Sequence, residues 1–264
     1  MSKISRFTKK AVQLAKNAGG ERGEAEYAVV SLHCLRVYLE KSYREAHLLS
    51  EMPQILGEIG LNAADLPKHS TLVKWFDRIK TALWRVLLRL SAQLHEPSGH
   101  AAIDATFFDR ENASKHYCRR TNYRVQTLKT TALVDTESQA ILDVHCTTEK
   151  RHDTQLGWQV ALRNAGDLAS LAAGKGYDWM DLREKLREEG VRLLIKHREY
   201  RPIGHAHTTR VDGPRYRQRA MCETVFSTIK RTLGDAVRAR TWYGEFRELV
   251  LMCAVHNIKQ SLKQ

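Results

Sequence analysis

The hydrophobic pattern of the sequence changes at Pro97-Ser98-Gly99, and this change constrains the fold more than any other feature. Before it, apolar residues recur every three or four positions, as on the buried faces of amphipathic helices. After it, short apolar runs alternate with charged, helix-like segments, as in a sheet that is covered by helices. The sequence therefore predicts an all-helical N-terminal domain followed by an α/β domain.

The N-terminal part divides at Gly19-Gly20. Residues 1–25 are polar, which favours a poorly ordered arm. Helical patterns then continue through residues 26–96, most clearly in TLVKWFDRIKTALWRVLLRL, which begins at Thr71. Three or four short helices with basic faces suit a helix-turn-helix-like DNA-binding domain. An ordinary helical subdomain fits the same pattern equally well.

The part after the boundary predicts a mixed sheet with flanking helices over residues 100–264. Strands are expected at 101–108, 127–136, 140–148, 168–174 and 191–196, with a hairpin turn at Thr136-Glu137-Ser138. Helices are expected at 152–164 and 178–189, and two more after a polar loop over 197–213.

The net charge points to an anionic partner. The chain has 43 Lys and Arg against 30 Asp and Glu, a formal charge of +13, and the excess is spread over both halves. Such a field attracts polyanions, of which nucleic acid is the commonest. No uncharged apolar run approaches the roughly 20 residues that span a bilayer. The start has no secretory signal, and the 5 scattered cysteines form no C-x-x-C pair. We therefore expect a cytoplasmic protein without a membrane partner.

The sequence does not support a nucleotide-binding loop or a histidine metal site. The segment Gly174-Lys175-Gly176 lacks the first glycine and the Ser or Thr of a P-loop, and Trp179 stands where a dinucleotide fingerprint needs glycine. His205 and His207 have no cysteine or carboxylate nearby, so solvated loop histidines explain them better than a metal site.

A helix that begins at Pro214 carries the strongest functional pattern. At about 100° per residue, Tyr216, Arg219, Glu223 and Lys230 fall within about 60° of arc, beside an apolar face. An ordinary ion pair explains Arg219 with Glu223, but it does not explain a stripe of four such residues. Asp104 adds a carboxylate to an otherwise apolar strand, where aspartate is disfavoured.

These residues resemble those of a known family. The spacing Tyr216-x2-Arg219-x3-Glu223-x6-Lys230 is similar to the YREK motif of insertion-sequence DDE transposases, most like the insertion-sequence five group. The segments IDATFFDR, AAGKGYD and VRARTWYGEFRELVLMCAVHNI resemble further family segments, in the same order. The N-terminal segments SYREAHLLSEMPQILGEIGL and LPKHSTLVKWFDRI also resemble the helical region of the family.

The resemblance implies a ribonuclease-H-like fold in which Asp, Asp and Glu hold two Mg²⁺ ions for cleavage and strand transfer of DNA. Asp104 and Glu223 match the first and third carboxylates and are the expected metal ligands. Arg219 and Lys230 would grip phosphate and Tyr216 would orient a water or a backbone oxygen. We also expect Arg119 and Arg120 among the DNA contacts.

The sequence departs from the family pattern at the second carboxylate. Where the family reads Ala-Asp-x-Gly-Tyr, this chain reads Ala173-Gly174-Lys175-Gly176-Tyr177. Asp167 lies seven residues upstream and is too far to substitute. Asp178 and Asp181 lie where the next helix begins, and helix capping is their expected role. Impaired chemistry is therefore expected.

Three functions are compatible with these residues. The first is an insertion-sequence transposase, expected to be a homodimer in contact with the nucleoid, that binds the terminal inverted repeats of its element and the target duplex. Its Mg²⁺-dependent catalysis would be impaired at Gly174. The second is a catalytically inactive DNA-binding protein, either a decayed transposase or a repressor of its element. The third is a metal-dependent nuclease that makes nicks without joining strands.

Overall fold

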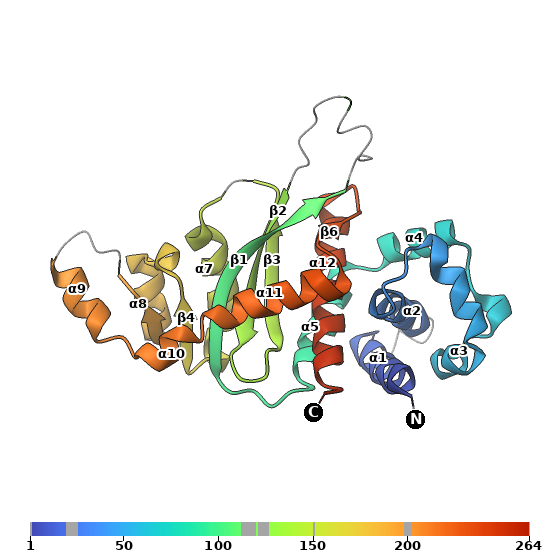
Figure 1. Ribbon diagram of the computed structural model, residues 1–264, viewed down its shortest axis with the longest axis horizontal. Coiled ribbons are helices and arrows are strands. Elements are labelled where there is room, and N and C mark those ends of the chain that lie inside the picture. Colours follow the sequence, from blue (N-terminus) through green and yellow to red (C-terminus); the bar gives the residue numbers. More distant parts are fainter. Residues whose placement is uncertain are drawn as a thin grey trace. The chain divides into compact units, whose positions relative to one another are not determined.

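The computed structural model describes residues 2–19, 26–111, 120, 127–149, 151–197 and 202–263. Two compact units emerge from its contacts (Figure 1). Unit 1 comprises Met1–His95, Thr232–Gly234 and Tyr243–Gln264, and unit 2 comprises Glu96–Arg231 and Asp235–Trp242. Within the described ranges, no helix combines the length and the apolar character needed to cross a membrane.

Unit 1 is helical. It contains α1 (Lys3–Gly19), α2 (Glu26–Tyr38), α3 (Pro53–Ile59), α4 (His69–Arg78), α5 (Thr81–Ala92) and most of α12 (Trp242–Gln260), with 3-10 turns η2 (Arg44–Glu51) and η3 (Ala63–Asp65). Helix α1 contacts α2, α3 and α5. The all-helical N-terminal region predicted from the sequence is confirmed.

Both ends of unit 1 differ from the sequence-based expectation. In place of a polar arm, α1 buries Phe7, Ala11, Leu14 and Ala15, which repeat at helical spacing within a basic segment. The order of the sequence predicts the closing helix as part of the α/β domain. Its residues from Tyr243 onward belong to unit 1 instead, where the Asn257 amide donates to Ser91 Oγ at 3.0 Å.

A buried histidine lies in the core of unit 1. The His33 ring is edge-on to Phe76 and Trp84, with ring centroids 5.2 and 6.2 Å apart, and neither ring nitrogen has a hydrogen-bond partner among the described residues. Loss of solvent, and then the charge of Arg36, lower the pKa of His33 from 6.5 to about 3. The fold therefore holds this ring neutral.

We expect His33→Phe to make the protein less sensitive to acid. Below pH 6.5 His33 binds a proton in the unfolded chain, whereas in the folded chain it stays neutral down to about pH 3. The contribution of His33 to the free energy of unfolding is therefore fully present above pH 6.5 and is lost as the pH falls. The loss from this group amounts to roughly 3 kcal/mol at pH 4.5. Urea unfolding at pH 7.5 and 4.5 measures it, with the exposed His69→Phe as the control. Equal pH dependence in both variants would contradict the prediction.

Unit 2 is built on a mixed sheet. Its strands are β1 (His100–Arg110), β2 (Thr127–Asp135), β3 (Ile141–Thr147), β4 (Ser170–Ala173), β5 (Arg192–Ile195) and the short β6 (Ala236–Val237). The order is β3-β2-β1-β4-β5, with β1–β2 and β2–β3 antiparallel and β1–β4 and β4–β5 parallel. This confirms the mixed sheet predicted from the sequence.

The two faces of this sheet carry different helices. Ala101 and Ile103 of β1 share a buried apolar cluster with α7 (Asp153–Arg163) and α8 (Met180–Glu188). Because strand side chains alternate, Asp104 and Thr106 point to the opposite face, where α11 (Ala220–Leu233) crosses the strands (Figure 1). The remaining elements are η4 (Ala165–Asp167), η5 (Lys175–Tyr177), α9 (Pro202–Thr209) and α10 (Gly213–Arg217). Helix α9 lies in a segment whose sequence predicts a polar loop.

Candidate active site

Asp104 lies on the central strand of the sheet, between β2 and β4. Its Oδ1 accepts a hydrogen bond from the Ala105 N–H at 2.8 Å. Partial burial raises the pKa of Asp104, the Ala105 hydrogen bond opposes this, and the negative charges of Glu223 and Asp153 raise it further. A half-buried carboxylate among other carboxylates lies in negative potential, which a cation would relieve.

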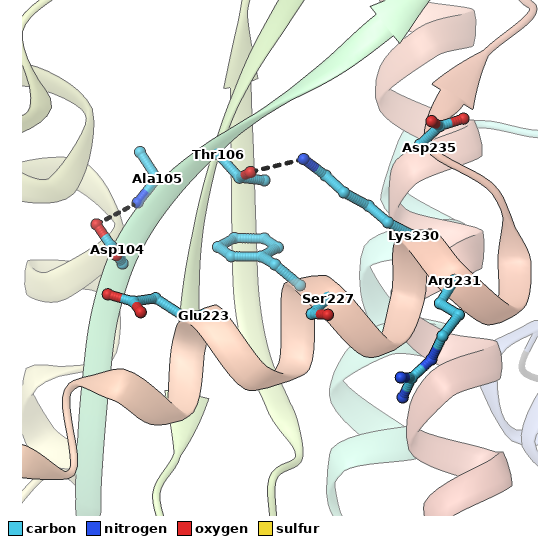
Figure 2. Close-up of a pocket in the computed structure, with 9 residues that line it drawn as sticks. Asp104, Ala105, Thr106, Glu223, Ser227, Lys230, Arg231 and Asp235 are labelled. Atoms are coloured by element: carbon cyan, nitrogen blue, oxygen red, sulfur yellow. Dashed lines mark hydrogen bonds between the residues drawn. The ribbon is translucent and has the colours of Figure 1, made fainter.

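Glu223 approaches Asp104 from the first turn of α11 (Figure 2). Its side chain is 60% exposed and pairs with Arg219 at 3.3 Å, four residues earlier. Exposed pairs of this kind hold a side chain weakly, so Glu223 can turn toward a ligand. Both carboxylates open into one pocket of about 560 Å³, which is lined by Asp104, Ala105, Thr106, Glu223, Phe226, Ser227, Lys230, Arg231 and Asp235.

Lys230 anchors the other end of this pocket. Its ammonium group donates to Thr106 Oγ1 and to the Phe107 carbonyl, both at 2.8 Å, and lies 5.2 Å from the centre of the Phe108 ring. Figure 2 shows the bond to Thr106 crossing from α11 to β1. These contacts fix a positive charge on the same face of the sheet as the two carboxylates.

Tyr216 does not share a continuous helix with the other residues of the motif. Asp212 caps α10, accepting the Arg215 N–H at 3.1 Å, but α10 ends at Arg217 and α11 begins at Ala220. The four-residue stripe predicted from a single helix is therefore interrupted. Tyr216 is absent from the pocket lining, and the ammonium of Lys196 lies 4.8 Å from its ring centre.

Gly174 follows β4 directly beside Asp104. The register pairs Ile103 with Ala173, so residue 174 comes next to residue 104 on the parallel neighbour. Its backbone is extended, with φ −68° and ψ 164°, and a Cβ at this position would meet no atom of the described residues within 4 Å. The position has the backbone conformation and the space for a side chain, but glycine provides no ligand.

None of the three nearby aspartates considered in the sequence analysis takes the place of a ligand at residue 174. The carboxylate of Asp178 binds Arg183 at 2.8 Å and His197 at 3.2 Å, so it forms a buried ion pair instead of capping α8. Asp181 lies in the first turn of α8 and is exposed. Asp167 is exposed in η4, before β4 begins.

The site fits a divalent cation only in part. Asp104 and Glu223 supply carboxylate oxygens, the ligands that Mg²⁺ prefers. With the side chains as they stand, however, no three His, Cys, Asp or Glu residues in the described ranges are grouped to hold a metal ion. His207 and His197, whose ring centroids lie 4.4 Å apart, form no such group either. The second carboxylate of a DDE site is thus missing at Gly174.

The remaining site residues from the sequence analysis lie on a segment between β1 and β2. Arg120 is exposed, and Arg119 lies outside the described residues. Sequence reasoning missed Asp153, whose charge acts on Asp104, and Thr106, which binds Lys230. Thr106 could have been found from the sequence, because side chains alternate between the faces of a strand and Thr106, two residues after Asp104, lies on the same face.

Comparison with known proteins decides the family. The family model described as "Transposase DDE domain" matches residues 95–258. The chain belongs to the transposase DDE domain family. A similar solved structure is the piggyBac transposase synaptic complex with hairpin DNA, determined by cryo-EM, with 10% sequence identity and a TM-score of 0.53. The match covers 97% of this chain and 71% of that one, and it supports the fold. No curated protein matches the sequence.

Proposed function

We propose that this member of the DDE transposase family is the transposase of an insertion sequence, most like the insertion-sequence five group, and that it cleaves and joins DNA slowly. The observation that carries the proposal is the open pocket in which Asp104 of β1 and Glu223 of α11 face each other beside Lys230. A bound Mg²⁺ would supply Lewis acidity for attack on a phosphodiester.

The chain's own residues have distinct roles in this proposal. Asp104 and Glu223 would hold the cation, with Ala105 N–H fixing one oxygen of Asp104. Lys230 would bind phosphate from its anchored position, while Arg219 would leave Glu223 to bind another phosphate. Tyr216 would act beside the pocket, on the DNA backbone. The glycine at residue 174 removes one ligand, so catalysis is expected to be slow.

The partner in this proposal is duplex DNA: the terminal inverted repeats of the element and the target, held by a homodimer at the nucleoid. The formal charge of +13 and the exposed Arg120 support an anionic partner. The similar piggyBac structure is a synaptic complex with hairpin DNA, which supports a paired arrangement of DNA ends. The helical N-terminal region would bind the element ends.

Two conservative substitutions test the carboxylate assignment. We expect Glu223→Gln and Asp104→Asn to reduce Mg²⁺- or Mn²⁺-dependent cleavage of the DNA that flanks the gene at least about 100-fold, because each removes a metal ligand. Binding of the same duplex should change less than about threefold at fixed salt, since phosphate contacts dominate affinity. Glu184→Gln, at an exposed position of α8, is the control.

The same assay separates the alternatives. A second candidate, a catalytically inactive DNA-binding protein, is favoured by Gly174 and would bind DNA without cleaving it at any metal concentration. A nuclease would nick a plasmid target without joining strands. Cleavage that survives both carboxylate substitutions would overturn the metal assignment.

A further inference from the structure

Part of the central strand β1 has no neighbouring strand on one of its edges. Strand β2 pairs with the other edge from Ala101 to Asp109. On the edge in question, β4 pairs with residues 100–103 and β6 with residues 109–110. Within the part of the chain that the structure describes, residues 104–108 are therefore uncovered on this edge, and the first three of them line the pocket.

Lys230 binds β1 within this uncovered stretch. The Asp109 N–H donates to the Asp235 carbonyl on the same edge, so the alternation of the strand places the Phe107 carbonyl on this edge as well. The Lys230 ammonium donates to this carbonyl and to Thr106 Oγ1, both at 2.8 Å, and lies 5.2 Å from the centre of the Phe108 ring (Figure 2). We call Thr106 Oγ1, the Phe107 carbonyl and the Phe108 ring the ammonium socket.

The Thr106 hydroxyl determines how firmly this socket holds the lysine. An ammonium group has three N–H donors, and the socket takes two of them, which leaves one for a further acceptor. Lysine has a flexible four-carbon stem, so a single acceptor would leave its nitrogen free to move. With two acceptors on adjacent residues of a central strand, the position of the nitrogen is fixed where Lys230, half-buried, lines the pocket.

We propose that Thr106 is a positioning residue for DNA: its hydroxyl, with the Phe107 carbonyl, holds the Lys230 ammonium so that the remaining N–H donates to a phosphate oxygen in the pocket. This inference rests on the proposed function, which gives Lys230 its phosphate. Thr106 itself does not touch the DNA and acts through the lysine. A position held in advance saves the cost of ordering the side chain when DNA binds.

Binding of DNA without metal tests this independently of cleavage. Fluorescence anisotropy of a labelled duplex from the DNA that flanks the gene gives the affinity of the full chain over a range of salt concentrations. Lys230→Met should lower the slope of log affinity against log salt by about 1. Thr106→Val keeps the branched shape but removes the acceptor, and should weaken binding about three- to tenfold. Thr106→Ser keeps the hydroxyl and should bind within about twofold of the wild type.

A double variant separates positioning from a general loosening of the sheet. In a Lys230→Met background, Thr106→Val should cause no further loss of affinity, because the hydroxyl has no ammonium left to hold. Thr228→Val is the matched control on α11, since the Thr228 hydroxyl donates to the Thr224 carbonyl of its own helix, and it should bind as the wild type does. Circular dichroism checks the fold of each variant, and Thr106→Ala serves as a second removal of the hydroxyl if Thr106→Val does not fold.

The outcomes distinguish this inference from the function on which it rests. Weaker binding by Lys230→Met, but wild-type binding by Thr106→Val, would overturn the role of Thr106 and leave the phosphate contact of Lys230 intact. The role of Thr106 would also be overturned if Thr106→Ser bound as weakly as Thr106→Val, or if the loss persisted in the double variant. Wild-type affinity and salt slope in Lys230→Met would overturn the phosphate contact and this inference together. A wild type that does not bind the duplex would overturn the proposed function as well.

Discussion

Gly174→Asp is expected to raise metal-dependent DNA cleavage about 100-fold or more. Removing supporting groups around a bound metal changes affinity or activity 10- to 100-fold, and a direct ligand should have at least the larger effect. The structure gives the side chain room, because the backbone of residue 174 is extended and, in the part of the chain that the structure describes, no atom of another element lies within 4 Å of where its Cβ would be. The parallel register with β1 brings the new carboxylate beside Asp104.

Two controls make this result specific. Gly174→Asn adds nearly the same volume without a charge and should raise cleavage much less. Gly166→Asp adds the same charge at an exposed glycine with equally open space and should leave cleavage unchanged. Initial cleavage rates of a labelled duplex at saturating Mg²⁺ provide the measurement. If the wild type already cleaved as fast as Gly174→Asp, the second ligand would have to come entirely from elsewhere in the chain.

The sheet was predictable because its strands carry a local signal. Short apolar runs between turn residues gave β1 to β5 nearly at their observed bounds, and the aspartate in β1 was conspicuous against its apolar neighbours. The interruption between Arg217 and Ala220 was not predictable in the same way. The two residues there, Gln218 and Arg219, are ordinary helix formers with neither Gly nor Pro to mark a break.

The environment of Asp153 was beyond sequence reasoning for a different reason. The approach of Asp153 to Gly176 arises from the tertiary packing of α7, between residues far apart in the sequence. The close approach of Gly157 to the Tyr177 ring is likewise a tertiary contact. An aspartate at a helix start is explained locally by its favourable charge at the helix dipole, and that explanation conceals its electrostatic effect on Asp104.

A buried ion pair at the end of β5 supports the loop that carries Gly174. Arg183 of α8 is 2% exposed, and its guanidinium donates to Asp178 Oδ1 and to the Ile195 carbonyl, both at 2.8 Å. The arginine thereby joins α8, the η5–α8 connection and the last residue of β5. A buried charge with satisfied partners is tolerated, but it becomes costly when one partner is removed.

We expect Asp178→Ala to destabilise the protein by roughly 3–5 kcal/mol, because it leaves the Arg183 charge buried without its counter-ion. Arg183→Met should cost less than Asp178→Ala, since the Asp178 carboxylate keeps His197 as a partner. The double variant should cost less than the sum of the two, because no buried charge is then left unpaired. Urea unfolding measures all three, with Arg187→Met at an exposed position of the same helix as the control.

Additive losses in the double variant would show that the pair does not act as a unit. The site would then depend on the packing of α8 alone for the position of Gly174.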